Sequence, residues 1–153
     1  MVNTYTQIHI QCVIAVKYQK SLIGEDWKDP LHKYITGVLQ NYGHKMLAIN
    51  SMPDHLHLFF GFRPNQSLND LMRIVKNESS VWVNDQQFTS AVFQWQEGYG
   101  AFSYSRSHVS KVIEYVLNQE EHHRKKTFLE EYQQFLEQFE VAYEERYIFK
   151  LPE

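Results

Sequence analysis

The sequence predicts an α+β fold in which one antiparallel sheet is built in the order β-α-β-β-α-β and further helices follow. Three observations support this prediction. Short segments rich in β-branched and aromatic residues alternate with segments whose apolar residues recur every three or four positions, and Gly, Pro and Asp mark the boundaries between them. The length of 153 residues fits one domain, expected over residues 1–153.

The first half of the chain is expected to form a strand, a helix and a hairpin. The helix has apolar residues at helical spacing and ends before Gly43, which suits a C-terminal cap. The hairpin rests on Pro53-Asp54, a pair suited to a tight turn between two short apolar segments. The elements expected here are a strand over Thr4–Val16, a helix over Pro30–Tyr42, and strands over Lys45–Met52 and His55–Phe62.

The second half is expected to begin with a helix that Ser67 caps and that runs to about Gln87. An aromatic strand segment over 91–104 follows, interrupted by Gly98 and Gly100. Two more helices are expected, one over about 107–123 with Ser107 as its cap and one from about 127 to 139, followed by a tail to 153. This order is that of ferredoxin-like and RRM-like domains, with additional C-terminal helices.

The composition excludes several classes of protein. Cys12 is the single cysteine, so neither an intrachain disulfide nor a cysteine-based zinc site is expected. No apolar run approaches the ~20 residues of a membrane helix. Residues 1–9 lack a signal-peptide pattern, so no membrane partner and a cytoplasmic location are expected.

The charge is unevenly distributed. The formal net charge is −3, but residues 127–153 hold seven acidic and two basic residues, which leaves residues 1–126 with a net charge of +2. This distribution argues against a protein that coats DNA wholesale, and it permits a local groove for nucleic acid on the mildly basic body.

His55-Leu56-His57 is the first candidate for chemistry. Because side chains alternate along a strand, the two histidines share one face while Leu56 points to the other. Both imidazoles can then converge on one cation, which neutral imidazole binds well. Taken alone, the spacing is more typical of hydrogen-bonded or exposed histidines.

Tyr115 and Gln119 are the second candidate, because residues four apart on a helix share a face. A tyrosine phenolate is a competent nucleophile toward phosphorus, and it requires a nearby cation because its ordinary pKa is about 10. The amide oxygen of Gln119 is an acceptable ligand for a hard metal ion. Taken alone, this spacing favours a core position for Tyr115 beside Ile113 and Val116.

Several separated segments together resemble the single-tyrosine HUH transposases, the TnpA enzymes of single-strand insertion sequences. MPDHLHLFF (52–60) holds the His-hydrophobic-His motif of that family. WQEGYGAFSYS (95–105) and VIEYVLNQEEHHRKKTF (112–128) resemble its second block, and YEERYIF (143–149) resembles its tail. The segments fall in the order of the family over nearly the whole chain.

The resemblance implies an activity and a set of site residues. It makes Tyr115 the catalytic nucleophile and His55, His57 and Gln119 the ligands of Mg²⁺ or Mn²⁺. Such enzymes bind single-stranded DNA hairpins at transposon ends and cleave the strand through a 5′-phosphotyrosine, which releases a 3′-hydroxyl that later rejoins strands. They act as homodimers in which the tyrosine helix of one subunit serves the histidines of the other.

Four basic residues are candidate contacts for DNA. Lys76, and with a weaker case Arg73, are expected to meet phosphate from the helix after Ser67. Arg124 and Lys125 belong to a basic run at 122–126, which is typical of a solvated surface and secondarily of a contact with the DNA backbone.

Other residues have a structural interpretation that is favoured over a functional one. Asp54 suits a turn better than a support for the metal site. Trp95 and Tyr99 suit core packing better than base stacking. Gly98 and Gly100 precede the tyrosine helix, and we hypothesise that they help this segment move.

Three other functions stay open. A domesticated relative would apply the same nuclease chemistry to repeated chromosomal hairpins. A non-catalytic module would hold single-stranded nucleic acid on its sheet, but it has no use for both histidines together with Tyr115 and Gln119. A metal-dependent hydrolase would leave free phosphate ends and form no covalent protein–DNA adduct.

Overall fold

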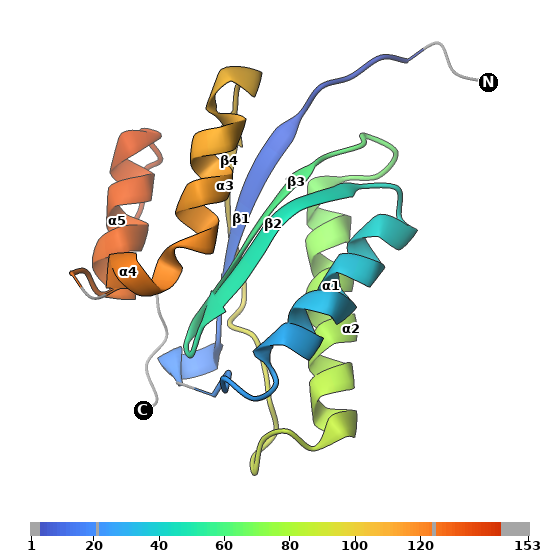
Figure 1. Ribbon diagram of the computed structural model, residues 1–153, viewed down its shortest axis with the longest axis vertical. Helices are drawn as coiled ribbons and strands as arrows, with labels where there is room; N and C mark the ends of the chain where they lie inside the picture. Colours follow the sequence, from blue (N-terminus) through green and yellow to red (C-terminus); the bar gives the residue numbers. More distant parts are fainter. Residues whose placement is uncertain (1–3, 21, 124, 145–153) are drawn as a thin grey trace.

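The computed structural model describes residues 4–20, 22–123 and 125–144, and its strands form one antiparallel sheet in the order β2-β3-β1-β4 (Figure 1). The strands are β1 (His9–Ala15), β2 (Lys45–Met52), β3 (His55–Gly61) and β4 (Gly100–Tyr104). Because β3 inserts between β1 and β2, the sheet has the split arrangement of ferredoxin-like domains. The predicted fold class is confirmed.

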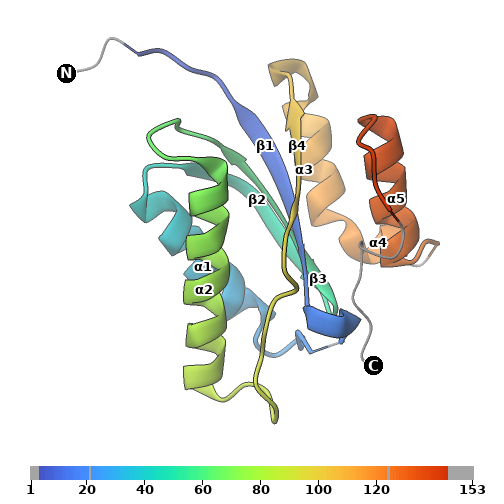
Figure 2. The same ribbon diagram turned by 180° about the vertical axis from the view of Figure 1, so that it is seen from behind.

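Helices cover both faces of the sheet. α1 and α2 lie on one face, and α3, α4 and α5 lie on the other (Figures 1 and 2). The helices are α1 (Lys28–Asn41), α2 (Leu68–Gln86), α3 (Val109–Leu117), α4 (Gln119–His123) and α5 (Phe128–Gln138), with short 3-10 helices η1 (Lys17–Gln19) and η2 (Arg106–His108).

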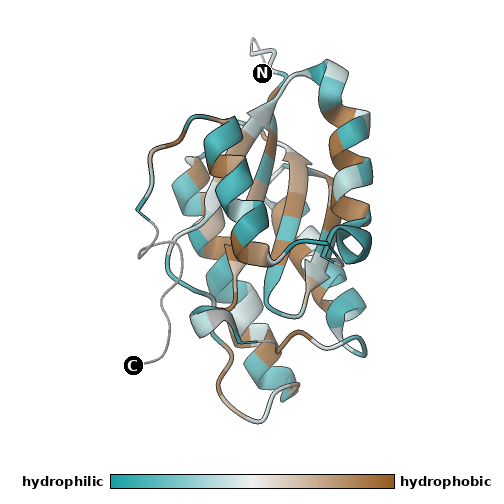
Figure 3. Ribbon diagram, turned by 90° about the vertical axis from the view of Figure 1, so that its left-hand side faces the viewer, coloured by the Kyte–Doolittle hydropathy of each residue, from teal (hydrophilic) through white to brown (hydrophobic). Residues whose placement is uncertain are grey.

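Strand β3 contributes to both layers because its side chains alternate. Leu56 and Leu58 are buried in the core shared with α1 and α2, whereas Phe59 packs against Val112 and Val116 of α3. Figure 3 shows the result: the strands are largely hydrophobic, and the helices in front of them are mixed in polarity. The odd-numbered positions of β3, which include both histidines, therefore face the layer of α3, α4 and α5.

Several local predictions are confirmed. Ser67 caps α2 by accepting a hydrogen bond from the backbone N–H of Asp70 at 3.0 Å. Gly43, with φ of +90°, follows α1 as the left-handed residue that ends it. A cap that the sequence did not predict is Thr127, which begins α5 and forms a reciprocal capping box with Glu130.

Two strands are shorter than predicted. β1 begins at His9 rather than at Thr4, and β4 begins at Gly100 rather than at Ala91. The backbone between residues 91 and 99 instead makes irregular hydrogen bonds. The Asn84 side chain bonds the N–H and the C=O of Phe93, and an isolated β-bridge joins Val16 to Trp95. The aromatic residues of this segment pack in the core without lying in a regular strand.

The expected helix over 107–123 is interrupted, and Ser107 does not cap it. The turn η2 precedes α3, and no side-chain cap bond is made at the start of either. At Asn118 the backbone leaves the helical region, with φ of −101° and ψ of 29°. The Nδ2 amide of Asn50 on β2 donates to the carbonyls of Val116 and Leu117 at 3.1 and 3.2 Å, so the end of α3 is capped from the sheet.

Helix α5 packs closely on the end of the sheet. A Cβ built on Gly100 would lie 2.7 Å from the Tyr132 hydroxyl, so the missing side chain lets α5 approach β4. The predicted hinge role of Gly100 and of Gly98, whose φ is +86°, stays a prediction. Within the described part of the chain, no helix is long and apolar enough to cross a membrane.

A candidate metal centre beside a tyrosine

Two histidines of β3 form the centre of the site. His55 and His57 are both fully buried, with 0% of each residue exposed, and their ring centroids are 5.1 Å apart. The predicted convergence of the two imidazoles on one face of the strand is what the structure shows. Burial of two polar rings requires partners for their nitrogen atoms.

In both rings, Nδ1 forms a hydrogen bond with a neighbouring side chain. Asp54 lies 2.7 Å from His55 Nδ1, and the side-chain amide of Gln11 on β1 lies 3.0 Å from His57 Nδ1. Gln11 is itself buried and bonds the Tyr104 hydroxyl at 2.9 Å. Asp54 accepts from His55 Nδ1, which leaves Nε2 of the neutral ring free to bind a metal, whereas the Gln11 amide nitrogen holds the His57 ring through Nδ1.

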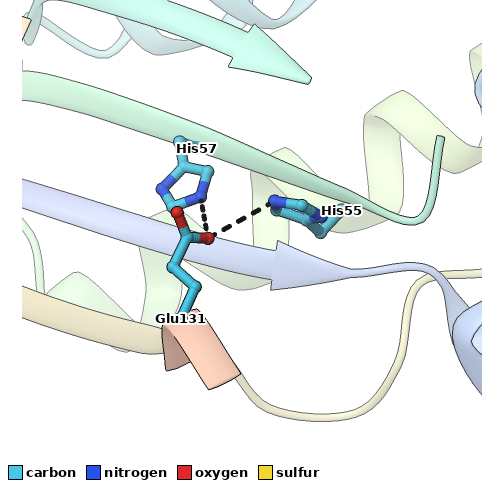
Figure 4. A group of neighbouring side chains, drawn as sticks. All are labelled: His55, His57 and Glu131. Atoms are coloured by element: carbon cyan, nitrogen blue, oxygen red, sulfur yellow. Dashed lines mark hydrogen bonds and ion pairs between the residues drawn. The ribbon is translucent and has the colours of Figure 1, made fainter. Parts of the chain in front are cut away.

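A carboxylate from α5 meets the two Nε2 atoms (Figure 4). Glu131 Oε1 is 3.1 Å from His57 Nε2 and 3.6 Å from His55 Nε2, and it is also 3.3 Å from Nε2 of His123. One donor atom from each of His55, His57 and Glu131 lies within 4.8 Å of the others, which makes them a group able to hold a metal ion.

Gln119, the third predicted ligand, also reaches this group. Its Oε1 is 3.5 Å from His55 Nε2, and its Nε2 donates to the Tyr115 carbonyl at 3.3 Å. Gln119 is fully buried although it is polar and lies at the start of the short helix α4. The break at Asn118 therefore leaves Gln119 and Tyr115 directed at the same region from two helices.

Tyr115 lies next to the carboxylate. Its hydroxyl donates to Glu131 Oε2, and its ring meets that of His57 edge-on at 6.0 Å between centroids. The half-buried tyrosine also lines a cavity of about 250 Å³ together with Gln11, Lys111 and other residues of α3 and α5. The predicted nucleophile, Tyr115, is thus accessible from the cavity on one side and contacts Glu131 and His57 on the other.

The electrostatics of this cluster favour a neutral phenol and a charged acid. Burial and the neighbouring Glu131 carboxylate raise the pKa of Tyr115 well above its ordinary value. Burial opposes ionisation of Glu131, but hydrogen bonds with His123 and His57 hold its pKa well below the usual range. The phenol therefore needs additional positive charge nearby to become a phenolate.

The donor set fits a divalent metal ion. Two imidazole nitrogens, an amide oxygen and a carboxylate oxygen combine borderline and hard ligands, as Mn²⁺ accepts and as Mg²⁺ accepts less readily. His55, His57 and Gln119 would hold the ion, and the carboxylate stands beside them.

The predicted DNA contacts on α2 lie on the opposite face of the sheet. Arg73 and Lys76 line a groove of about 450 Å³ together with Trp95 and Tyr99, so the structure brings four separately predicted residues to one place. The Lys76 ammonium donates to the carbonyls of Gln96 and Gly98 at 2.7 and 2.8 Å, which binds it within the fold. Arg73 is exposed and lies 3.7 Å from Asp70.

The basic run after α4 is only partly described. Arg124 lies outside the described residues. Lys125 is exposed and lines, together with His123 and Asp54, a shallow depression beside the metal-binding group. Among the predicted DNA contacts that the structure describes, Lys125 is thus the one near the histidines.

Sequence reasoning missed Glu131 and Gln11. Glu131 sits in the acidic first turn of α5, where acids are common at helix N-termini, and Gln11 lies in a strand without a motif. Asp54 occupies the predicted turn, and its carboxylate also accepts a hydrogen bond from His55 Nδ1. Each contact joins the histidines to a residue whose type alone carries no signal.

Comparison with known proteins gives concordant matches. The family model described as "Transposase IS200 like" matches residues 4–119. The chain is 21% identical over 118 residues to the ISDra2 transposase TnpA of Deinococcus radiodurans, and the alignment covers 74% of this chain and 84% of the relative. The matched range of the family contains both histidines, Tyr115 and Gln119, and it ends before Glu131.

Two solved structures share the fold. A crystal structure of a transposase from Deinococcus radiodurans R1 superposes with a TM-score of 0.62 at 19% identity, covering 78% of this chain and 95% of that chain. The structure of a REP-associated tyrosine transposase bound to a REP hairpin gives a TM-score of 0.59 at 12% identity, covering 80% of this chain and 73% of that chain.

Proposed function

The chain belongs to the IS200-like transposase family, and from that premise we propose that it cleaves and rejoins single-stranded DNA with Tyr115 as the nucleophile. The observation that carries this proposal is the position of Tyr115 within one cluster with His55, His57 and Gln119. A non-catalytic binding module would not require a buried polar cluster of this kind beside a tyrosine.

The proposed reaction exchanges one phosphodiester for another. The Tyr115 oxygen attacks the phosphorus, a phosphorus–oxygen bond to tyrosine forms, and the bond to the 3′-oxygen breaks. The phenol gives up its proton, the 3′-oxygen gains one, and the reverse reaction with a different 3′-hydroxyl rejoins strands. Because one phosphodiester replaces another, no further energy source is required.

Mg²⁺ or Mn²⁺ is the proposed cofactor, held by His55, His57 and Gln119. When bound there, the ion supplies positive charge that polarises the phosphate and stabilises the tyrosine oxygen. The protein's part is to hold the imidazoles by Asp54 and Gln11 and to keep the phenol within the same buried cluster. Mn²⁺ suits the two imidazoles better than Mg²⁺ does.

A DNA hairpin with a single-stranded flank is the proposed substrate, supported by the fold shared with a transposase bound to a REP hairpin. Lys125, Arg124, Arg73 and Lys76 are the proposed basic contacts. A homodimer is part of the proposal. The contact between Tyr115 and the site of its own chain supports a cis arrangement of the tyrosine helix over an exchanged one.

The decisive experiment is a covalent-adduct assay. Labelled hairpin DNA with a single-stranded flank is incubated with the protein and Mn²⁺ and analysed on a denaturing gel. The wild type and Tyr42→Phe, a change at a tyrosine on the other face of the sheet, are expected to give a labelled protein band, and Tyr115→Phe is expected to give none. Cleavage that yields free phosphate ends without an adduct would indicate a hydrolase and overturn the proposal.

A further inference from the structure

We propose that Glu131 is a ligand of the metal ion, supplied to the site by the C-terminal helix α5. This inference rests on the proposed function, because it concerns the same cation. Residues 4–119 match the family, so α5 lies outside the matched range. The chain would then complete its metal site with a carboxylate that the family match does not contain.

The distances are those of ligands around one ion. Two atoms bound to a cation at about 2.1 Å lie about 3.0 Å apart at a right angle and about 3.4 Å apart at a tetrahedral angle. Glu131 Oε1 lies 3.1 Å from His57 Nε2 and 3.6 Å from His55 Nε2. Gln119 Oε1 lies 3.5 Å from the same nitrogen of His55, so three pairs of donor atoms have the spacing of neighbouring ligands around one ion.

The protonation pattern of His55 also points to a cation. Its Nδ1 donates to the Asp54 carboxylate at 2.7 Å, so in the neutral ring Nε2 carries a lone pair. The same nitrogen lies 3.5 Å from Gln119 Oε1 and 3.6 Å from Glu131 Oε1, and both of these atoms are acceptors. A cation bound between these three atoms would satisfy all of them within the buried site.

The local structure holds Glu131 in this position. The capping box of Thr127 and Glu130 fixes the first turn of α5. The ring of Phe128, the residue after Thr127, stacks on the ring of His55 with 3.8 Å between centroids and 4° between planes. Two turns after Phe128, Phe135 stacks on Phe102 of β4, with 5.0 Å between centroids. The carboxylate is therefore anchored on both sides, and 5% of its side chain is exposed.

The second carboxylate oxygen gives the ligand a positioning role. Glu131 Oε2 accepts the hydrogen bond of the Tyr115 hydroxyl while Oε1 faces the histidines. If Oε1 binds the cation, Oε2 would thus hold the phenol oxygen of Tyr115 beside that cation. The nucleophile would be oriented before DNA arrives.

Direct measurement of Mn²⁺ binding to the full chain tests the proposal. Isothermal titration, with free Mn²⁺ followed in parallel by electron paramagnetic resonance, is carried out on the wild type, Glu131→Gln, Glu130→Gln and His57→Ala. Glu130→Gln is the matched control. Glu130 is an exposed neighbour on α5, and glutamine preserves its role in the capping box, so this variant removes one negative charge from the same turn, as Glu131→Gln does. We expect Glu131→Gln to weaken binding by about 10- to 100-fold and Glu130→Gln to leave it unchanged.

Equal or tighter Mn²⁺ binding by Glu131→Gln would overturn the proposal, because the carboxylate would then act as an ionic partner that competes with the cation. If His57→Ala alone loses binding, the metal site of the proposed function stands without Glu131. If the wild type binds no Mn²⁺, the metal site itself fails. Should Glu131→Gln not fold, Glu131→Asp, which withdraws the carboxylate by one methylene, is expected to weaken binding in the same direction.

Discussion

The Tyr115 hydroxyl donates a hydrogen bond to the Glu131 carboxylate, and the two residues belong to one chain. The same carboxylate lies 3.1 Å from His57, so one residue connects the proposed nucleophile with the proposed metal ligands. Both contacts lie within one chain, which agrees with the proposed cis arrangement of the tyrosine helix.

The proposed cis arrangement predicts the result of a complementation test. Tyr115→Phe and His57→Ala are each expected to be inactive, and a mixture of the two is expected to stay at background, because each subunit lacks one part of its own site. If tyrosine helices were exchanged in a dimer, the mixture would contain one intact site and would regain adduct formation. The measurement is the labelled protein band on a denaturing gel after the two proteins have been co-refolded.

Removal of the support behind His57 should weaken metal binding. Gln11→Ala leaves His57 Nδ1 without its partner, so the ring is free to turn, and the Mn²⁺ affinity is expected to fall by about 10- to 100-fold. Tyr104→Phe removes only the outer bond to Gln11 and is expected to bind Mn²⁺ like the wild type. Equal affinities of the wild type and Gln11→Ala would show that Gln11 does not orient the imidazole. Isothermal titration measures both.

The end of α3 should depend on one side chain of the sheet. Asn50→Ala removes two hydrogen bonds to the carbonyls of Val116 and Leu117, and it is expected to lower the free energy of unfolding by about 1–3 kcal/mol. Asn65→Ala, which removes one exposed bond to the Tyr42 carbonyl, is the control and should cost less. Urea denaturation compares them, and equal losses for the two variants would argue against the cap.

The fold was predictable because its signals are local. Alternation in His55–Gly61 and helical spacing after Ser67 are properties of neighbouring residues, and the Ser67 side chain caps its helix by accepting from a backbone N–H only three positions away. The limits of β1 and β4 were less accurate. Whether a segment such as 91–99 pairs with a strand or binds Asn84 depends on tertiary contacts.

The site was predictable in part for the same reason. His55 and His57 share a strand face, and Tyr115 and Gln119 are four residues apart, so each pair leaves a pattern in the sequence. Glu131 approaches His57 from 74 positions away, and no spacing records that contact. Likewise, the bonds that hold the Lys76 ammonium come from backbone carbonyls, which every residue possesses.

Stability should depend on pH through His32 of α1. Burial lowers the pKa of His32 to about 4, although Asp29 acts in the opposite direction. Its Nε2 lies 2.7 Å from the Ser51 hydroxyl on β2, so the neutral ring links α1 to the sheet. Because the folded-state pKa lies below the unfolded value of about 6.5, the unfolded state binds the proton more readily between these two values.

The contribution of His32 is therefore fully present above pH ~6.5 and is lost as the pH falls toward 4, by about 1–3 kcal/mol in total. His32→Gln keeps a polar partner for Ser51 and removes the titrating group, so the difference in unfolding free energy between the wild type and this variant should shrink as the pH falls through that window. Urea denaturation at several pH values between 4 and 8 measures this difference. A difference that stays constant with pH would mean that the ring titrates equally in the folded and unfolded chains.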